Sequence, residues 1–162
     1  MVGEVLSLGA FFKDMNLGRL DTLLTNLELL TEQKQERDML GIVKSHEAEL
    51  VDLNIAQMDV QGIDSKGNRL KPYRNPQYAQ RKRALNPRGV TDLHLTGAFH
   101  RDMFIDASRF PVVIDSSNEK TPKLKAQYGD DIMGLTSENT KGPAQEILRP
   151  SVEEYYRGFL VV

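Results

Sequence analysis

The chain of 162 residues lacks both cysteine and tryptophan. Without cysteine it can form no disulfide, no thiolate nucleophile and no cysteine-bound metal site, so its stability has to come from packing or from assembly with partners. Because only 7% of its residues are aromatic, a stacking platform for single-stranded nucleic acid is not expected. The chain also has no apolar run of transmembrane length and no signal peptide, which predicts a protein made in the cytoplasm without membrane contact.

Proline is missing from the first 71 residues, since all seven prolines lie at or after Pro72. The absence of the strongest helix breaker favours long helices in this half. Two apolar stripes at helical spacing support them, one of leucines over residues 17–30 and one over residues 39–60. The polar stretch 31–38 between the stripes is either a solvated helix surface or a break.

Turn and strand signals dominate the rest of the chain. We predict, in order, a helix over residues 76–85, strands over 104–106 and 110–115, a helix from Thr121 to a stop at Gly129, mostly loop over 130–150, and a helix from Ser151 to about Tyr156. The protein is thus expected to be α+β, with long amphipathic N-terminal helices over residues 1–61. A core of residues 62–162 follows, with a small antiparallel sheet and packed short helices, and we expect it to form one compact unit with the N-terminal helices.

Charge is segregated along the chain, although the net charge is only −2. Residues 1–65 carry a net charge of −7, residues 66–88 one of +8 with no acidic residue, and residues 89–162 one of −3. Opposite charges on separate surfaces can attract copies of a subunit head to tail, and a heterologous contact of this kind closes into a ring when the rotation allows. The alternative is a solvated basic loop balanced by ion pairs within the chain.

Candidates for catalysis or metal binding are few, and the sequence has no GxSxG, Walker or GxGxxG motif. His94 and His100 are separated by six residues, which does not match a pair on one helix face. With Asp92 and Asp102 nearby, they still imitate a site of two histidines and one carboxylate. His46 falls on an apolar helix stripe and is interpreted as a packed residue. We therefore predict no enzyme, no cofactor and no metal.

The most informative motif is Leu95-Thr96-Gly97, a turn between two apolar segments, in which Thr96 is predicted to cap a short helix. Other signals surround it in order: Tyr78 to Lys82 upstream, then the two strands, the helix that closes on Tyr128-Gly129, and Arg149-Pro150. Over roughly residues 45–160 this order resembles the tail-completion and head–tail connector proteins of tailed bacteriophages, including the Mu-type virion morphogenesis family.

A finer pattern is similar to structural proteins of Bacteroidetes phages, the crAss-like group among them. It comprises Asp64 to Asn68, the Leu-Thr-Gly turn, Asn118 to Lys120, Tyr128 to Asp130, and Gly134-Leu135. The resemblance implies a virion protein, made in the host bacterial cytoplasm, that forms a homo-oligomeric ring at the neck or tail end. Such a ring joins portal or adaptor proteins to tail proteins around a channel for double-stranded DNA, without sequence-specific contact.

On this basis we assign residues to a subunit interface and to the motif turns. The interface candidates are Arg74, Tyr78, Arg81, Lys82, Arg83, Arg88, Arg149 and Pro150, and the turn residues are Leu95, Thr96, Gly97, Tyr128 and Gly129.

The basic segment 66–88 also allows a different function, that of a nucleic-acid-binding accessory protein. Its eight cationic side chains are interleaved with Tyr73 and Tyr78, and they could hold a phosphate backbone. Against this interpretation, the flanking segments are acidic, and no helix-turn-helix or zinc-finger spacing is recognisable.

Overall fold

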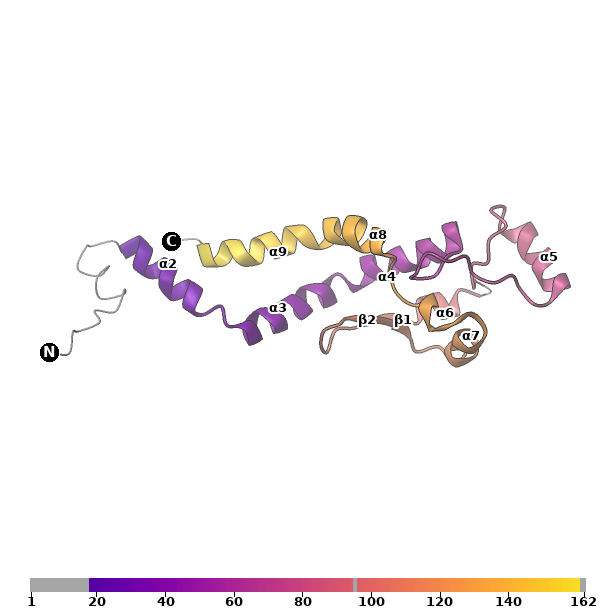
Figure 1. The fold of residues 1–162 in the computed structure, drawn as a ribbon, viewed down its shortest axis with the longest axis horizontal. Coiled ribbons are helices and arrows are strands. Elements are labelled where there is room, and N and C mark those ends of the chain that lie inside the picture. Colours follow the sequence, from indigo (N-terminus) through magenta and orange to yellow (C-terminus); the bar gives the residue numbers. More distant parts are fainter. Residues whose placement is uncertain (1–17, 95, 161–162) are drawn as a thin grey trace.

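The computed structural model describes residues 18–94 and 96–160. Leu17 of the predicted leucine stripe and Leu95 of the Leu-Thr-Gly turn lie outside the described residues. The molecule is elongated: helices from both halves of the sequence run side by side along one part, and a short helix projects at the opposite end (Figure 1). The predicted α+β class is confirmed, because long helices are combined with one small sheet.

The N-terminal helices form three segments and a π-turn instead of two continuous rods. They are α2 (Gly18–Glu28), α3 (Glu32–Ser45), α4 (Glu47–Ala56) and the π-helix η1 (Gln57–Gln61). The Thr31 side chain accepts a hydrogen bond from the backbone N of Lys34 at 3.2 Å and so caps α3. The polar stretch 31–38 therefore contains this cap and the first turns of α3. His46 lies between α3 and α4, half-buried, with its Nε2 2.9 Å from Ser151 Oγ.

The sheet has two antiparallel strands, β1 (Met103–Asp106) and β2 (Val113–Ser116). Met103 and Ile105 of β1 are buried, whereas Phe104 and Asp106, which alternate with them, are exposed, as the period of two requires. The strand predicted over residues 110–115 begins later, because Pro111 has no N–H to donate to a ladder. The Glu47 carboxylate accepts the backbone N–H of Ile105 at 2.7 Å, which ties β1 to α4.

Two of the predicted short helices are confirmed at both ends. The first is α5 (Pro76–Leu85), where Asn75 Oδ1 accepts the backbone N–H of Tyr78 at 3.1 Å. The second is α7 (Thr121–Tyr128), which stops at Gly129. The Leu-Thr-Gly turn leads into a single helical turn, α6 (Ala98–Arg101).

The prediction that residues 130–150 are mostly loop is wrong. After the short η2 (Asp130–Ile132), helix is continuous through α8 (Ser137–Asn139), η3 (Thr140–Ala144) and α9 (Gln145–Leu160). Pro143 lies in the π-turn and Pro150 inside α9. A proline inside a helix costs about 3 kcal/mol. Here tertiary packing outweighs local preference, since Ala144 is buried and Ile147 and Leu148 pack against the core.

One hydrophobic core spans both predicted parts of the chain. Leu50, Val51 and Met58 from α4 and η1 pack with side chains of the sheet, of α6 and α7, and with Ile132, and α9 packs along α2 and α3. None of the helices in the described ranges has the length and apolarity that crossing a membrane requires.

Candidate interaction site at the basic end

Helix α5 is fastened to the body of the molecule by a buried ion pair. Lys82 is only 6% exposed, its Nζ lies 2.9 Å from the carboxylate of Asp92, and it also donates to the backbone carbonyl of His94. Lys82 is among the interface candidates predicted from the sequence, and its burial corrects that prediction, because a side chain inside the molecule cannot contact a neighbouring subunit. Lys82 points inward because Asp92 neutralises its charge and lets it anchor the helix.

Asp92 is the centre of a hydrogen-bond network. Besides Lys82, three groups donate hydrogen bonds to its carboxylate. They are the Tyr73 hydroxyl at 2.7 Å, the Asn86 side-chain amide at 2.9 Å and the backbone N–H of His94 at 3.0 Å. Burial on its own would raise the pKa of Asp92, but these donors outweigh it and lower that pKa to about 2. The same burial, together with the hydrogen bond to Asp92, raises the pKa of Tyr73.

The Tyr73 hydroxyl also shapes the turn before the Leu-Thr-Gly motif. It accepts hydrogen bonds from the backbone N–H groups of Asp92 and Leu93, each at 3.2 Å. Leu93 has φ 55°, a left-handed conformation that a leucine adopts only when its surroundings impose it. Tyr73 and Asp92 therefore hold this turn in place.

A groove of about 290 Å³ lies between α5, this turn and α7. Its lining is mainly apolar, with the exposed cations Arg74 and Lys120 among the residues at its edge. Tyr73 and Tyr78 meet edge to face in it, with ring centroids 4.9 Å apart. Five of the residues predicted from sequence are brought together here: Arg74, Tyr78, Thr96, Gly97 and Tyr128.

Gly97 has a conformational role in this groove. Its φ is 74°, and a Cβ atom at this position would lie 3.1 Å from Nε2 of His94, so a side chain would be both strained and crowded. Gly97, not Thr96, is the N-cap of α6, which corrects the predicted cap. The Thr96 hydroxyl accepts only a long hydrogen bond, 3.4 Å, from the backbone N of Ala98.

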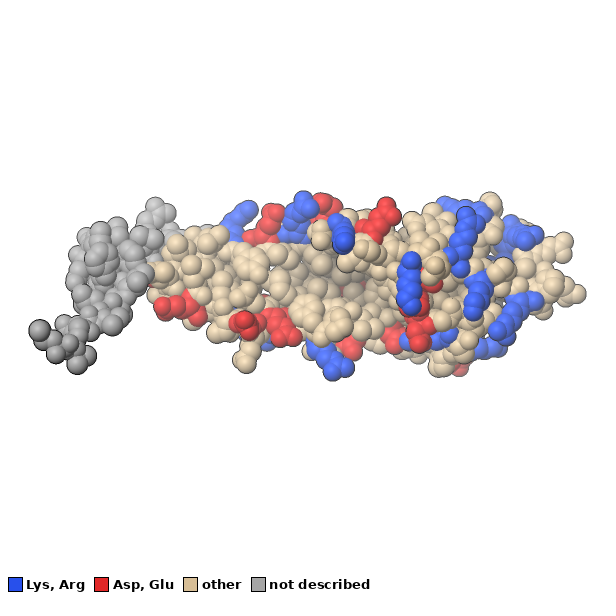
Figure 2. Space-filling model, viewed as in Figure 1, with Lys and Arg blue, Asp and Glu red and all other residues tan. Residues whose placement is uncertain are grey.

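Six of the eight cations of residues 66–88 are exposed and form no ion pair with any described residue. The two exceptions are Lys82 and Lys66, which pairs with Asp131 at 2.7 Å. Figure 2 shows Lys and Arg gathered over the end of the molecule that carries α5. The six exposed cations are Arg69, Lys71, Arg74, Arg81, Arg83 and Arg88.

The remaining interface candidates lie elsewhere. Arg149 and Pro150 are exposed in α9, which runs away from α5 toward the opposite end of the molecule (Figure 1). Arg149 pairs with Glu146 at 2.7 Å within the same helix. These two residues therefore do not belong to the groove.

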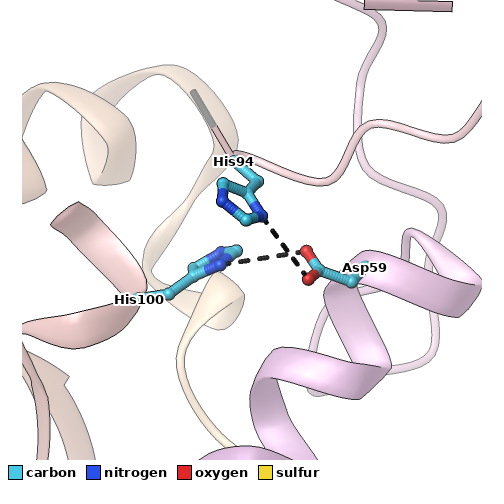
Figure 3. A group of neighbouring side chains, drawn as sticks. All are labelled: Asp59, His94 and His100. Carbon is cyan, nitrogen blue, oxygen red and sulfur yellow. Dashed lines mark ion pairs between the residues drawn. The ribbon is translucent and has the colours of Figure 1, made fainter. Parts of the chain in front are cut away.

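The structure brings His94 and His100, which were considered from the sequence, together with a carboxylate that was not, Asp59. The Nδ1 atoms of His94 and His100 lie 3.7 and 3.8 Å from the two carboxylate oxygens of Asp59, which belongs to η1 (Figure 3). The carboxylates considered from sequence, Asp92 and Asp102, have other partners. Asp92 forms an ion pair with Lys82, and Asp102 accepts a hydrogen bond from the side chain of Asn118 at 2.6 Å. No signal in the sequence links Asp59 to the histidines, because the contact depends on packing of distant segments.

Burial lowers the pKa of His100, although the Asp59 carboxylate opposes this shift. The neutral imidazole is therefore favoured at physiological pH. No protein-family model, no curated protein and no solved structure matches this chain.

Proposed function

We propose that this protein is a structural subunit of a tailed-phage virion, at the neck or the end of the tail. Identical subunits assemble into a ring, around the DNA channel, between portal or adaptor proteins and tail proteins. In this role the protein is made in the host cytoplasm, ends in the virion and catalyses no reaction.

The observation that carries this proposal is the convergence of separate motif segments on one groove. Tyr78 from α5, Gly97 from the turn and Tyr128 from α7 are far apart in sequence but line the same hollow. An apolar hollow with cations at its edge suits a protruding segment of a neighbouring subunit, because an apolar centre with a polar rim is the usual anatomy of a protein interface.

Charge placement supports contact between identical subunits. The basic end carries six exposed cations without an ion pair to the described residues, whereas α2, α3 and α4 expose acidic side chains. These acidic residues are Asp21, Glu28, Glu32, Glu36, Glu49 and Asp52. The six exposed cations of the basic end and these acidic side chains lie on different parts of an elongated molecule (Figure 1). One copy can therefore attract the next through two different surfaces, which is the geometry of a heterologous ring contact.

A charge-reversal experiment tests this interface. Arg81→Glu with Arg83→Glu reverses two exposed charges on α5, and Lys141→Glu with Arg157→Glu is a matched control with the same change in net charge at exposed positions outside α5. Light scattering and chemical cross-linking at low salt, with and without virion partners, measure assembly. We expect the α5 variant to lose assembly and the control to retain it, and assembly of the unmodified protein should weaken as salt rises. A chain that stays monomeric in the virion as well as in solution would refute the ring.

The same exposed cations favour a second function, an accessory protein that binds nucleic acid. A titration of duplex DNA at physiological salt distinguishes the two. For the structural subunit we expect weak binding that is indifferent to sequence and is lost as salt rises, because the sequence has no helix-turn-helix or zinc-finger spacing that would place an element against base edges. Tight, salt-resistant binding to one sequence would instead assign residues 66–88 to DNA recognition.

A further inference from the structure

Three side chains with metal-binding atoms converge from three segments of the chain. Asp59 comes from the π-turn η1, His94 from the loop before the Leu-Thr-Gly motif and His100 from α6. One ligand atom from each lies within 4.8 Å of the other two, and the two imidazole rings meet at 5.1 Å between centroids (Figure 3). π-Turns inside helices occur frequently at functional sites, and this one aims a carboxylate at both histidines.

The three side chains of the cluster do not form hydrogen bonds with one another. The histidine-to-carboxylate separations of 3.7 and 3.8 Å are too long for hydrogen bonds. Asp59 Oδ1, the oxygen that faces Nδ1 of His100, is buried and has no hydrogen-bond partner among the described residues. Buried polar atoms are nearly always paired, so this unpaired carboxylate oxygen beside two imidazoles indicates a missing partner.

We propose that Asp59, His94 and His100 form a binding site for a divalent transition metal ion with the ligand preference of zinc. Imidazole nitrogen and carboxylate oxygen are both ordinary zinc ligands. Bonds of about 2.1 Å in a tetrahedral arrangement place two ligand atoms about 3.4 Å apart. One ligand atom of each residue lies within 4.8 Å of the other two, so no pair of them has to close by more than about 1.4 Å.

The surroundings allow the ion to enter and complete its coordination. A hollow of about 300 Å³ opens beside the cluster and is lined by both Asp59 and His94. The side chain of His94 is 49% exposed, whereas the side chain of His100 is only 6% exposed. A water molecule could reach the fourth coordination position from the hollow. Two cations line the same hollow: Asp92 neutralises the charge of Lys82, and Arg88 is exposed, so solvent screens its charge.

Bound metal would join η1, the segment that carries His94 and α6, and so brace the turn that lines the groove. In a chain without cysteine it would take the place of a covalent cross-link. This inference departs from the sequence-based prediction of no metal and does not depend on the proposed virion function.

Zinc chloride titrated into tag-free protein, followed by calorimetry, tests the site. The expected result is saturable binding of one ion per chain. At a free zinc concentration about 100 times the dissociation constant, the ratio of folded to unfolded protein should rise about 100-fold, seen as a higher Tm. Cobalt chloride should give the visible absorption bands of a tetrahedral centre.

Variants locate the binding. Asp59→Asn and His94→Gln should each weaken zinc binding at least about 10-fold, since even residues behind a metal ligand contribute factors of about 10–100. His46→Gln is the matched control, because His46 contacts Ser151 and lies outside the cluster, and it should bind zinc like the unmodified chain. His100 is buried, so Asp59→Asn and His94→Gln decide the outcome if His100→Gln fails to fold. Absence of saturable binding, or binding that survives both substitutions, would overturn the proposal.

Discussion

Two carboxylates beside the same loop, Asp92 and Asp59, have opposite surroundings. Asp92 accepts hydrogen bonds from Lys82, Tyr73 and other donors, and it is 5% exposed. Asp59 lies more than 3.5 Å from the nearest nitrogen of either histidine, and its Oδ1 is buried without a partner in the described part of the chain. His94 lies next to both carboxylates: its backbone N–H donates to Asp92, and its ring faces Asp59.

The difference separates a structural role from a binding role. A fully satisfied buried network fixes one conformation, and removing one member leaves the others unpaired. A cluster with unpaired polar atoms contributes little to the stability of the fold by itself, but a bound ligand that pairs with these atoms can stabilise it. Asp92 therefore positions α5 and the turn, whereas Asp59 is available for an added ion.

The largest expected effect is that of Asp92→Ala on stability. Removing one partner of a buried ion pair typically costs about 3–5 kcal/mol, because the other charge stays buried and uncompensated. Lys82 is that charge here, at 6% exposure. Urea denaturation should show a loss of this size, together with exposure of α5 to proteolysis.

The exposed pair between Lys66 and Asp131 provides the control for Asp92→Ala. Their side chains are 66% and 41% exposed, so the pair is screened by solvent. Asp131→Ala should change the free energy of unfolding by less than about 1 kcal/mol. Equal losses for the two substitutions would show that burial of the Asp92 network contributes nothing.

Acid should also lower the free energy of unfolding by protonating Asp92, but by less than Asp92→Ala does. The pKa of Asp92 is lowered from 3.8 to about 2 on folding, so its contribution is complete well above pH 3.8 and disappears as the pH falls through about 2. The shift corresponds to roughly 2 kcal/mol. Between pH 6 and pH 2 the free energy of unfolding of the unmodified chain should therefore fall by this amount more than that of Asp92→Asn. Parallel pH curves for the two proteins would contradict the assignment.

Much of this arrangement could be predicted from sequence where the signal is local. Asn75-Pro76 predicts the start of α5, Thr121-Pro122 that of α7, and β-branched residues the two strands. Five groove residues were also selected individually, although nothing in the sequence showed that they share one hollow.

Three features that the sequence did not predict involve contacts between distant segments. The burial of Lys82 depends on Asp92, the continuity of α9 through Pro150 depends on packing against the core, and the histidine cluster depends on Asp59 from η1. A pattern of neighbouring residues contains no information on which segments pack together, so these features required the structure.

Tyr73→Phe should cost less than the loss of Asp92. The substitution removes the hydroxyl that accepts from the backbone N–H groups of Asp92 and Leu93, while Lys82 keeps its countercharge. Leaving buried donors without an acceptor costs about 1–2 kcal/mol. Urea denaturation measures this loss, and faster hydrogen exchange at Leu93 would show that the strained turn loosens. Unchanged exchange at Leu93 would contradict the role given to Tyr73.

The smallest effect is expected for Asp59→Asn in the presence of a chelator. Asparagine has nearly the same shape, and the carboxylate that it replaces makes no close hydrogen bond at its buried oxygen. The change in the free energy of unfolding should therefore stay within about 0.5 kcal/mol, as for substitutions that break no defined interaction. When zinc replaces the chelator, the unmodified chain should gain stability and Asp59→Asn should not, because a ligand stabilises only the state that binds it. A large loss with the chelator present would place Asp59 in the same structural class as Asp92, and the contrast between the two carboxylates would then be wrong.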